Sequence, residues 1–462
     1  MQLLTIALLA AAASSVADAA RKSHTAFTKP IQLGQGGVSN DFHILPIPKG
    51  PIAVYRFAAD IVEIRPDGTV VPTPNYDAYL HHHVVGSRHA AYKHKQSSWS
   101  PMKQEGMYAG VGFGAGTESR GTPQEFSYPY AFMTADGEDE WIANVHIINT
   151  RAMPPARAHH CLECPCTSTD VLANGTVNGY ELGLRCNAQL LHEKNTACFA
   201  ETYRGGLRCC NDRELCLETK DLDATAPTST YYMRYTIDYD EVVDTNRQLY
   251  LAACCDASGD VAHHGAVEYD IPPCDVATNP GCTHTLSTVQ AIGRGGGAFG
   301  FGADFNATDD VEVELVYAVG HQHRGGLGIE LYDAKTDELL CISYPTYGSG
   351  NVAGNESGYI VAMSHCSFDP PRRMRSTDIV RIVATYNNTV GHTGAMSLWY
   401  LAIADYKPHD EVKTSSVSGV AVVGGLFVAA LLGAVAVVLY KRRQATRAGY
   451  EKVVETTPVV SQ

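Results

Sequence analysis

The cysteines constrain the fold of this 462-residue chain more than any other feature, because all 14 lie between Cys161 and Cys366. An even number of cysteines confined to one part of a chain predicts disulfides and therefore folding in an oxidising, exported compartment. Eight of them lie within residues 154–223, which we interpret as a cysteine-rich insertion stapled by disulfides. The full pairing stays open at this stage, because one sequence is compatible with many connectivities.

Local cysteine patterns bear on the pairing in three places. Within His159–Cys166, three cysteines follow two histidines with zinc-like spacing, but an exported chain favours disulfides over a zinc site. The adjacent cysteines Cys209-Cys210 and Cys254-Cys255 predict bridges in which each member pairs with a separate partner.

The N-terminal end of the chain indicates export. An apolar start runs into an alanine stretch that ends at Ala17-Asp18-Ala19, a small-x-small cleavage signal, so we expect a signal peptide over residues 1–19.

The C-terminal end indicates a membrane anchor. Ser418–Tyr440 holds 23 residues without a charge. At ~1.5 Å rise per residue, a helix of that length crosses a hydrocarbon core of ~30 Å. Lys441-Arg442-Arg443 follows at once, and positive residues stay cytoplasmic, so residues 441–462 are predicted to be the tail. The chain should thus be a single-pass type I protein of the cell surface or a secretory-pathway membrane. A GPI signal is the weaker alternative, because a removable tail would not end in a basic polar segment.

The surface chemistry excludes one class of partner. A net charge of −14 leaves no basic stripe to follow phosphates, so a nucleic-acid partner is not expected. The oligomeric state is left open. Four Asn-x-Ser/Thr triplets are glycosylation acceptors that agree with an exported surface, at Asn174, Asn306, Asn355 and Asn387.

The ectodomain has the pattern of a mainly β protein. Glycine and proline recur every ten or so residues, and between them run short segments rich in valine, isoleucine, tyrosine and threonine, without a sustained helical period. The clearest predicted strands are Ile52–Ile64, Trp141–Ile148, Tyr231–Tyr239, Val311–Val319, Ile379–Thr385 and Met396–Ala404. We expect two jelly-roll-like β-sandwich domains, at residues 24–275 and 283–406, followed by a polar stalk at 407–417 and the membrane helix at 418–440.

Histidine spacing suggests a metal. In His321-Gln322-His323 the two imidazoles are two residues apart and would share one face of a strand, so ligation and a plain surface pair are about equally expected. The run His81-His82-His83 needs an irregular strand to aim two neighbours at one ion. His146 alone is more typical of a satisfied core residue, and Met396 alone is typical of core packing. Imidazoles with a soft thioether, however, suit copper.

The sequence resembles the stress-up-regulated Nod family. The resemblance runs through most of the ectodomain, in Gly116-Thr117-Glu118-Ser119-Arg120, Asn144-Val145-His146, Cys161-Leu162-Glu163-Cys164, Gly320-His321-Gln322-His323-Arg324-Gly325-Gly326, Pro345-Thr346-Tyr347-Gly348 and Gly354-Asn355-Glu356-Ser357-Gly358-Tyr359-Ile360. That family implies no defined biochemical activity.

A more distant resemblance does imply an activity. The order His-His, Val-His, His-x-His, Met is similar to ascorbate-dependent type II copper monooxygenases of the peptidylglycine-hydroxylating and dopamine-hydroxylating kind. Those enzymes hold two coppers, one in each of two β-sandwich domains, across a solvent-filled cleft. The resemblance assigns His82, His83 and His146 to one copper, His321, His323 and Met396 to the other, and Tyr400 to the substrate side. His82-His83 is preferred to His81-His82 because the apolar residues Val84-Val85 follow it directly.

Two departures from that pattern bear on the substrate. Val319 stands where the peptide-hydroxylating enzymes carry an arginine, and Leu398 stands where they carry an asparagine. Both groups help to hold the substrate's polar end, so a peptidyl-glycine substrate is doubtful. The function expected from the resemblance is hydroxylation of a C–H bond of a small molecule or peptide, with ascorbate as reductant. The alternative is a non-catalytic copper-binding or stress-related surface glycoprotein on the same scaffold.

Overall fold

The structure is a computed structural model that describes residues 21–89, 107–134, 139–166, 176–177, 180–181, 186–206, 209–210, 215–223, 225–252, 254–259, 268–294 and 310–408. The predicted signal peptide at 1–19, the membrane span at 418–440 and the tail at 441–462 lie outside these residues. In the described part of the chain, no helix is both long and apolar enough to cross a membrane.

The described chain is mainly β, as predicted. Each predicted strand is present with nearly the expected bounds, and Ile52–Ile64 matches to the residue. Helices are few and short, and they lie in connections: η3 (Thr117–Arg120), α2 (Pro155–Cys161), α3 (Ala188–His192), η4 (Thr196–Cys198) and η5 (Thr219–Asp221).

One large sheet runs through both halves of the ectodomain. Its strands follow the order β1 (Lys22–Phe27), β13 (Ser229–Glu241), β4 (Ile52–Ile64), β9 (Tyr130–Met133), β14 (Arg247–Leu251), β25 (Ser397–Asp405), β17 (Glu312–Gln322) and β22 (His365–Arg375). Three short strands attach at its side: β2 (Ile31–Leu33) on β13, and β5 (Val70–Pro72) and β8 (Gln124–Glu125) on β4. Because β14 pairs with β25, the two halves share backbone hydrogen bonds as well as side-chain packing.

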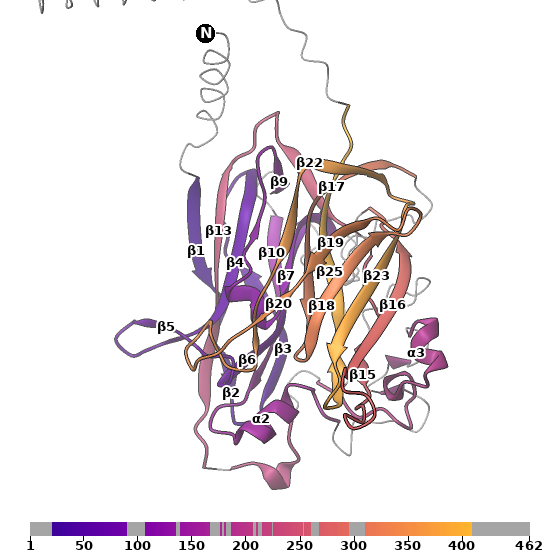
Figure 1. Ribbon diagram of the computed structural model, residues 1–462. Helices are drawn as coiled ribbons and strands as arrows, with labels where there is room; N and C mark the ends of the chain where they lie inside the picture. Colours follow the sequence, from indigo (N-terminus) through magenta and orange to yellow (C-terminus); the bar gives the residue numbers. More distant parts are fainter. Residues whose placement is uncertain are drawn as a thin grey trace, which may run out of the picture. The chain divides into compact units, whose positions relative to one another are not determined.

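In the N-terminal half, a second sheet packs on this one. Its order is β3 (Val38–Leu45), β10 (Asp139–Asn149), β6 (Ala78–His89) and β7 (Met107–Ala115). Phe57 of β4 stacks on Phe113 of β7 with ring centroids 4.6 Å apart, so the two sheets share an apolar core. In Figure 1 these indigo-to-magenta strands stand beside the orange and yellow strands of the C-terminal half.

The C-terminal half also has two layers. The sheet β16 (Thr283–Ala291), β23 (Ile379–Asn387), β18 (Gly326–Asp333) and β19 (Leu339–Ser343) faces β25, β17 and β22, and the disulfide Cys341–Cys366 joins β19 to β22. Three strand pairs complete the fold: β11 (Thr176–Val177) with β12 (Tyr180–Glu181), β15 (Tyr269–Ile271) with β24 (His392–Ala395), and β20 (Pro345–Tyr347) with β21 (Ile360–Met363).

All 14 cysteines form disulfides, as predicted. The pairs are Cys161–Cys216, Cys164–Cys210, Cys166–Cys209, Cys186–Cys198, Cys254–Cys255, Cys274–Cys282 and Cys341–Cys366. Cys209 and Cys210 do reach separate partners. The same expectation is wrong for Cys254-Cys255, which bond to each other because every other cysteine already has a partner from elsewhere in the chain.

The cysteine-rich insertion covers part of the outer face of the β3-β10-β6-β7 sheet. Cys161, Cys164 and Cys210 pack on Tyr79 of β6 and Ile148 of β10 in a small apolar cluster separate from the main core. The region around Tyr79 and Ile148 is therefore removed from water, although it points away from the sandwich interior.

Candidate metal centre

A bulge in β6 aims two consecutive histidines at one point. In the pairing of β6 with β10, His82 lies opposite His146 and Leu80 lies opposite Ile147, so His81 is an extra residue without a partner. A bulge lets neighbouring side chains leave on the same side of a strand, which a regular strand forbids. The ring of His81 accordingly lies 4.3 Å from that of His146, and the ring of His82 lies 5.1 Å from it.

His83 takes the opposite face. It lies across from Val145, a residue of the sandwich core, and its ring is 5.6 Å from that of Phe57. The structure thus joins His81, rather than His83, to His82 and His146.

The C-terminal half contributes two more imidazoles to the same place. His321 lies on β17 and His323 follows its end, and their ring centroids are 5.2 Å apart on the same face, as their spacing predicts. His323 lies 4.6 Å from His81. The histidines assigned to two separate coppers are therefore in contact through His81, and we name the group His81, His82, His146, His321 and His323 the histidine cluster.

Hydrogen bonds orient three of these rings. His321 Nδ1 lies 2.7 Å from Glu118 Oε1, and His323 Nδ1 lies 2.6 Å from the carbonyl oxygen of Gly394. Since a carboxylate and a carbonyl only accept, each Nδ1 carries the hydrogen and each Nε2 carries the lone pair. His82 is fixed the other way round, because its Nε2 donates to Asn144 Oδ1 at 2.8 Å. Metal-binding histidines are commonly held by such contacts.

Glu118 is itself held by the short helix η3. Gly116 N donates to Glu118 Oε1 at 2.9 Å, and a Cβ on Gly116 would stand 2.6 Å from His321 Cε1. Only glycine therefore allows the ring and the loop to approach this closely. This explains why a glycine stands two residues before Glu118.

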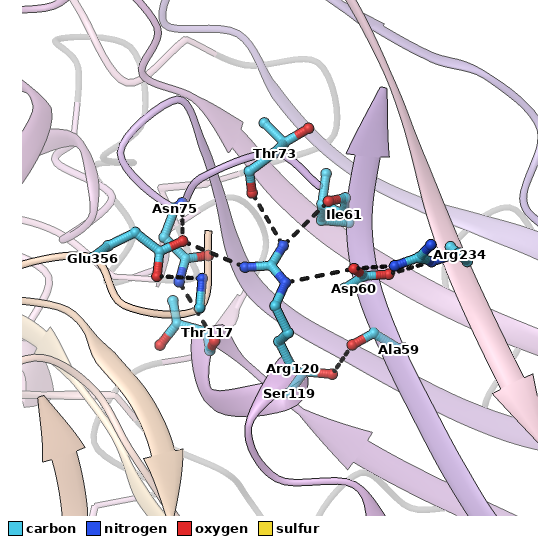
Figure 2. A network of polar contacts seen from close by, with 11 residues as sticks. Ala59, Asp60, Ile61, Thr73, Asn75, Thr117, Ser119, Arg120, Arg234 and Glu356 are labelled. Carbon is cyan, nitrogen blue, oxygen red and sulfur yellow. Dashed lines mark hydrogen bonds and ion pairs between the residues drawn. The ribbon is translucent and has the colours of Figure 1, made fainter. Parts of the chain in front are cut away.

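Figure 2 shows how Arg120, the last residue of η3, fixes this loop. Its guanidinium lies 3.5 Å from Asp60 Oδ2 and 3.4 Å from Glu356 Oε1. It also donates to the carbonyl oxygens of Ile61 and Thr73, at 3.3 and 3.1 Å.

Further contacts in Figure 2 extend this network to neighbouring strands. Asp60 is paired a second time with Arg234 at 2.9 Å, and Ser119 donates to the Ala59 carbonyl at 2.7 Å. The network ties η3 to β4 and β13, and therefore fixes Glu118 against His321.

Five further ring nitrogens of the cluster have no hydrogen bond. Both ring nitrogens of His81, both of His146 and Nε2 of His323 are buried without a hydrogen bond. Burying an unpaired polar atom costs about 1–3 kcal/mol, and native structures contain few of them. Five such donor atoms at one point are the arrangement expected of a set of metal ligands.

Burial also keeps the rings neutral. Desolvation lowers the pKa of His82 to about 4 and that of His323 to about 3. The pKa values of His81 and His146 are lowered too, first by burial and then by neighbouring imidazoles. Neutral imidazoles keep a lone pair for a metal at physiological pH.

One carboxylate and one disulfide border the cluster. Glu268 Oε1 lies 3.6 Å from His81 Nε2, and Glu268, His81 and His323 each offer one ligand atom, all within 4.8 Å of one another. His81, His82 and His146 form a second such group. The sulfurs of Cys164 and Cys210 lie near His146 but are bonded to each other, so no thiolate is available there.

A cavity opens beside the cluster, between the N-terminal and C-terminal strands. Its empty volume, counted out to its mouth, is about 680 Å³. His82, His83, Glu118, Thr122, Gln124 and His321 form its polar part, and the rest of its wall is largely apolar: Val84, Leu251, Ala252, Cys254, Val319, Met396, Leu398, Trp399, Tyr400 and Leu401 are among its lining residues. No lysine or arginine belongs to its lining in the described part of the chain.

Met396 and Tyr400, which the resemblance assigns to the second copper and to the substrate side, lie on this wall. Met396 lines the cavity together with His321, and its carbonyl accepts from the backbone N of His323 at 3.2 Å. Tyr400 lines it too, with its hydroxyl donating to the Gly112 carbonyl. Sequence reasoning missed Glu118 and Glu268, although Glu118 lies inside one of the family strings. Nothing in the spacing of Glu268 indicates its place.

Two of the four glycosylation acceptors can be placed. Asn355 and Asn387 are exposed, which suits glycan attachment. Asn174 and Asn306 lie outside the described residues.

One family model matches most of the chain. The model of the stress up-regulated Nod 19 family matches residues 19–406. The chain belongs to this family. The match covers every residue of the histidine cluster, together with Glu118 and Glu268. Among curated proteins, none matches the chain.

Solved structures add little to this. The VP2 subviral particle of infectious bursal disease virus is similar over 84% of this chain and 72% of its own, at 10% identity and a TM-score of 0.15. The structure of the Gx strain of the same virus covers 83% and 72%, at 10% identity and a TM-score of 0.16. Scores this low carry no argument about this protein.

Proposed function

We propose that this protein is a membrane-anchored, extracellular copper protein whose metal is held by the histidine cluster. The observation that supports this most is the convergence of five imidazoles from two halves of the chain, with five ring nitrogens buried and without hydrogen bonds. If these rings served packing alone, all five nitrogens would stay buried without a hydrogen bond, at a cost in free energy.

The donor set favours copper over the alternatives. Imidazole suits copper, zinc, iron and nickel, whereas magnesium and calcium require oxygen ligands. All cysteines are in disulfides, so a thiolate zinc site is not available. The thioether of Met396 lines the adjoining cavity with His321, and a soft sulfur beside imidazoles favours copper.

Residues of the chain would bind, orient and shield the ion. His81, His82 and His146 supply lone pairs from the N-terminal half, and His323 supplies one from the C-terminal half. Asn144 and Gly394 fix the ring orientation of His82 and His323. The cysteine-rich insertion excludes water from the part of the outer face around Tyr79 and Ile148. A predicted signal peptide and membrane span would place this centre outside the cell.

Copper binding can be tested on the full chain in detergent, stripped with a chelator and reloaded. We expect stable copper after desalting, measured by mass spectrometry. The double variant His82→Ala/His146→Ala should lose at least 100-fold in copper affinity. His43→Ala is the matched control, since His43 is also buried on the same sheet but faces the sandwich core. Equal binding by the wild type and the double variant, or retention of zinc but not copper, would contradict the proposal.

The cavity favours oxygenase chemistry as a second candidate. The resemblance to two-sandwich copper monooxygenases receives support from the two-layered halves and from a cavity wall that holds Met396 and Tyr400 next to His321. Bound copper would supply activation of dioxygen, with electrons from ascorbate or another reductant. The chain would hold the substrate against the imidazoles and exclude bulk water.

The cavity wall also indicates a substrate class. Val319 and Leu398, the two departures from the peptide-hydroxylating pattern, both line the cavity. Without a cationic group there, a carboxylate would be buried unpaired, at a cost of several kcal/mol. The substrate should therefore be small, uncharged and largely apolar.

Oxygen uptake tests this second candidate. The copper-loaded chain with ascorbate should consume oxygen faster when an uncharged aromatic compound such as indole is added, and less so with its carboxylated analogue. Met396→Ala should abolish the difference while retaining most of the bound copper. Uptake that equals that of free copper with ascorbate would rule out the oxygenase and leave copper binding as the function.

A further inference from the structure

We propose that His81 bridges two metal ions, one on each nitrogen of its imidazole ring, so that the histidine cluster is one dinuclear centre rather than two separate sites. This rests on the proposed function, because it requires that the cluster binds metal. It goes beyond the assignment from resemblance, which gives His81 no role and separates the two ions by a cleft.

The first argument is that two ligand groups share this one residue. His81 joins His82 and His146 in one group and Glu268 and His323 in the other, with the ligand atoms within 4.8 Å of each other in each group. No other residue is common to both. If each group holds an ion, His81 must serve both.

The second argument is the state of its two nitrogens. Nδ1 and Nε2 of His81 are both buried and neither has a hydrogen bond. By contrast, one nitrogen each of His82, His321 and His323 is bonded to an acceptor and can serve only one ion from the other side. An imidazole has its nitrogens on different edges of the ring, so a ligand on each can be bound without a clash.

His146 is the other ring with two unpartnered nitrogens, but it does not have two complete groups. Its second group is made by Cys164 and Cys210, whose sulfurs form a disulfide and lack the charge of a thiolate. The bridging role therefore falls to His81 alone among the described residues.

The third argument is the position of the ring. The bulge places the ring of His81 4.3 Å from that of His146, which stacks on it, and 4.6 Å from that of His323, which stands at 82° to it. Its Nε2 faces Glu268 Oε1 at 3.6 Å, which leaves Nδ1 for the group of His82 and His146. In the proposed centre the two nitrogens of His81 therefore serve different ligand groups, Nε2 the group of Glu268 and Nδ1 the other.

Charge and protons balance in this arrangement. The first cation binds the lone pair of the neutral ring, and the second replaces the remaining N–H proton, which passes to solvent. The resulting imidazolate and the Glu268 carboxylate place two negative charges among the cations. No electron is transferred in forming the bridge.

Electron paramagnetic resonance on the full chain, loaded with Cu(II), tests the bridge directly. Two Cu(II) ions on one imidazolate are spin-coupled, so we expect two copper ions per chain with most of the mononuclear signal lost. One copper per chain, or two with a full uncoupled signal, would overturn the bridge but leave the proposed copper function standing. No bound copper at all would overturn both.

Two variants sharpen the test. His81→Ala should bring the stoichiometry below two and abolish spin coupling, while His43→Ala should change neither. If His81→Ala does not fold, Glu268→Gln is the second variant. It weakens only the ligand group of Glu268 and His323, and should give one copper per chain with an uncoupled signal. An unchanged coupled pair in Glu268→Gln would contradict the assignment of that end.

Discussion

The N-terminal and C-terminal sides of the histidine cluster orient their rings in different ways. On the C-terminal side, β17 is regular at His321, and both His321 and His323 are oriented by an acceptor on Nδ1. On the N-terminal side, β6 is bulged, and neither His81 nor His146, whose ring stacks on it, has a hydrogen bond on any ring nitrogen. The difference indicates that His321 and His323 are oriented before metal binds, whereas His81 and His146 would be satisfied only by the metal.

Removing a ring should therefore change the stability of the protein in opposite directions on the two sides of the cluster. Removing an oriented ring leaves a buried acceptor without its donor, which is destabilising. Removing an unpartnered ring deletes atoms that were already unsatisfied. The predictions below test this contrast in the metal-free protein, beginning with the largest expected effect.

Arg120→Met should have the largest effect, a loss of about 3–5 kcal/mol in the free energy of unfolding, because it leaves Glu356 buried without its cation. The loop that carries Glu118 would also lose its fixed position. Urea unfolding measures the loss. Arg372→Met is the matched control, since Arg372 pairs with Glu338 at the exposed surface, where a pair contributes less than about 1 kcal/mol. Equal effects from both variants would contradict the role of the network.

The pH dependence of stability should show the buried neutral rings. The pKa of His82 is lowered to about 4 in the folded state, against 6.5 for the unperturbed group. Between these values the unfolded chain binds a proton that the folded chain does not, so stability is complete above pH 6.5 and falls as the pH drops toward 4. For this one ring the loss amounts to up to about 3 kcal/mol. His82→Leu should flatten the profile of unfolding midpoints, and an unchanged slope would contradict the burial of a neutral ring.

His321→Leu should destabilise the metal-free protein by about 2 kcal/mol, because Glu118 loses the hydrogen bond to Nδ1 and keeps the one from Gly116. A double-mutant cycle with Glu118→Leu separates the pair from simple packing. We expect a clear coupling energy between the two changes, whereas strict additivity would mean that the contact does not orient the ring.

His146→Leu should have the smallest effect, and of the opposite sign. Leucine removes two unpaired nitrogens while filling much of the same space, so the metal-free protein should be unchanged or more stable by about 1 kcal/mol. Its copper affinity should nevertheless fall sharply. A large destabilisation without loss of copper would contradict the proposed difference between the two sides of the cluster.

Much of the scaffold could be predicted from the sequence. Alternation of apolar residues located strands such as β4 and β10, and the confinement of cysteines predicted disulfides. The spacing of His321 and His323 predicted their common face, because period-two geometry is local. Cys254-Cys255 could not be assigned correctly, since pairing depends on which cysteines the fold has already brought together.

The N-terminal side of the site was harder to predict for the same reason. A bulge depends on the register between β6 and β10, which no pattern within β6 reveals, so His83 was expected where His81 lies. Glu268 contacts His81 from 187 residues further along the chain, and Glu118 reaches His321 through a loop. Such contacts follow from tertiary packing and leave no signature in residue spacing.

X-ray absorption at the copper edge of the loaded full chain tests the central claim most directly. The account predicts a first shell dominated by nitrogen, with the multiple-scattering pattern of several imidazoles, that is lost in His82→Ala/His146→Ala and retained in His43→Ala. A shell dominated by sulfur, or a spectrum that is the same in the double variant, would contradict the histidine cluster as the metal centre.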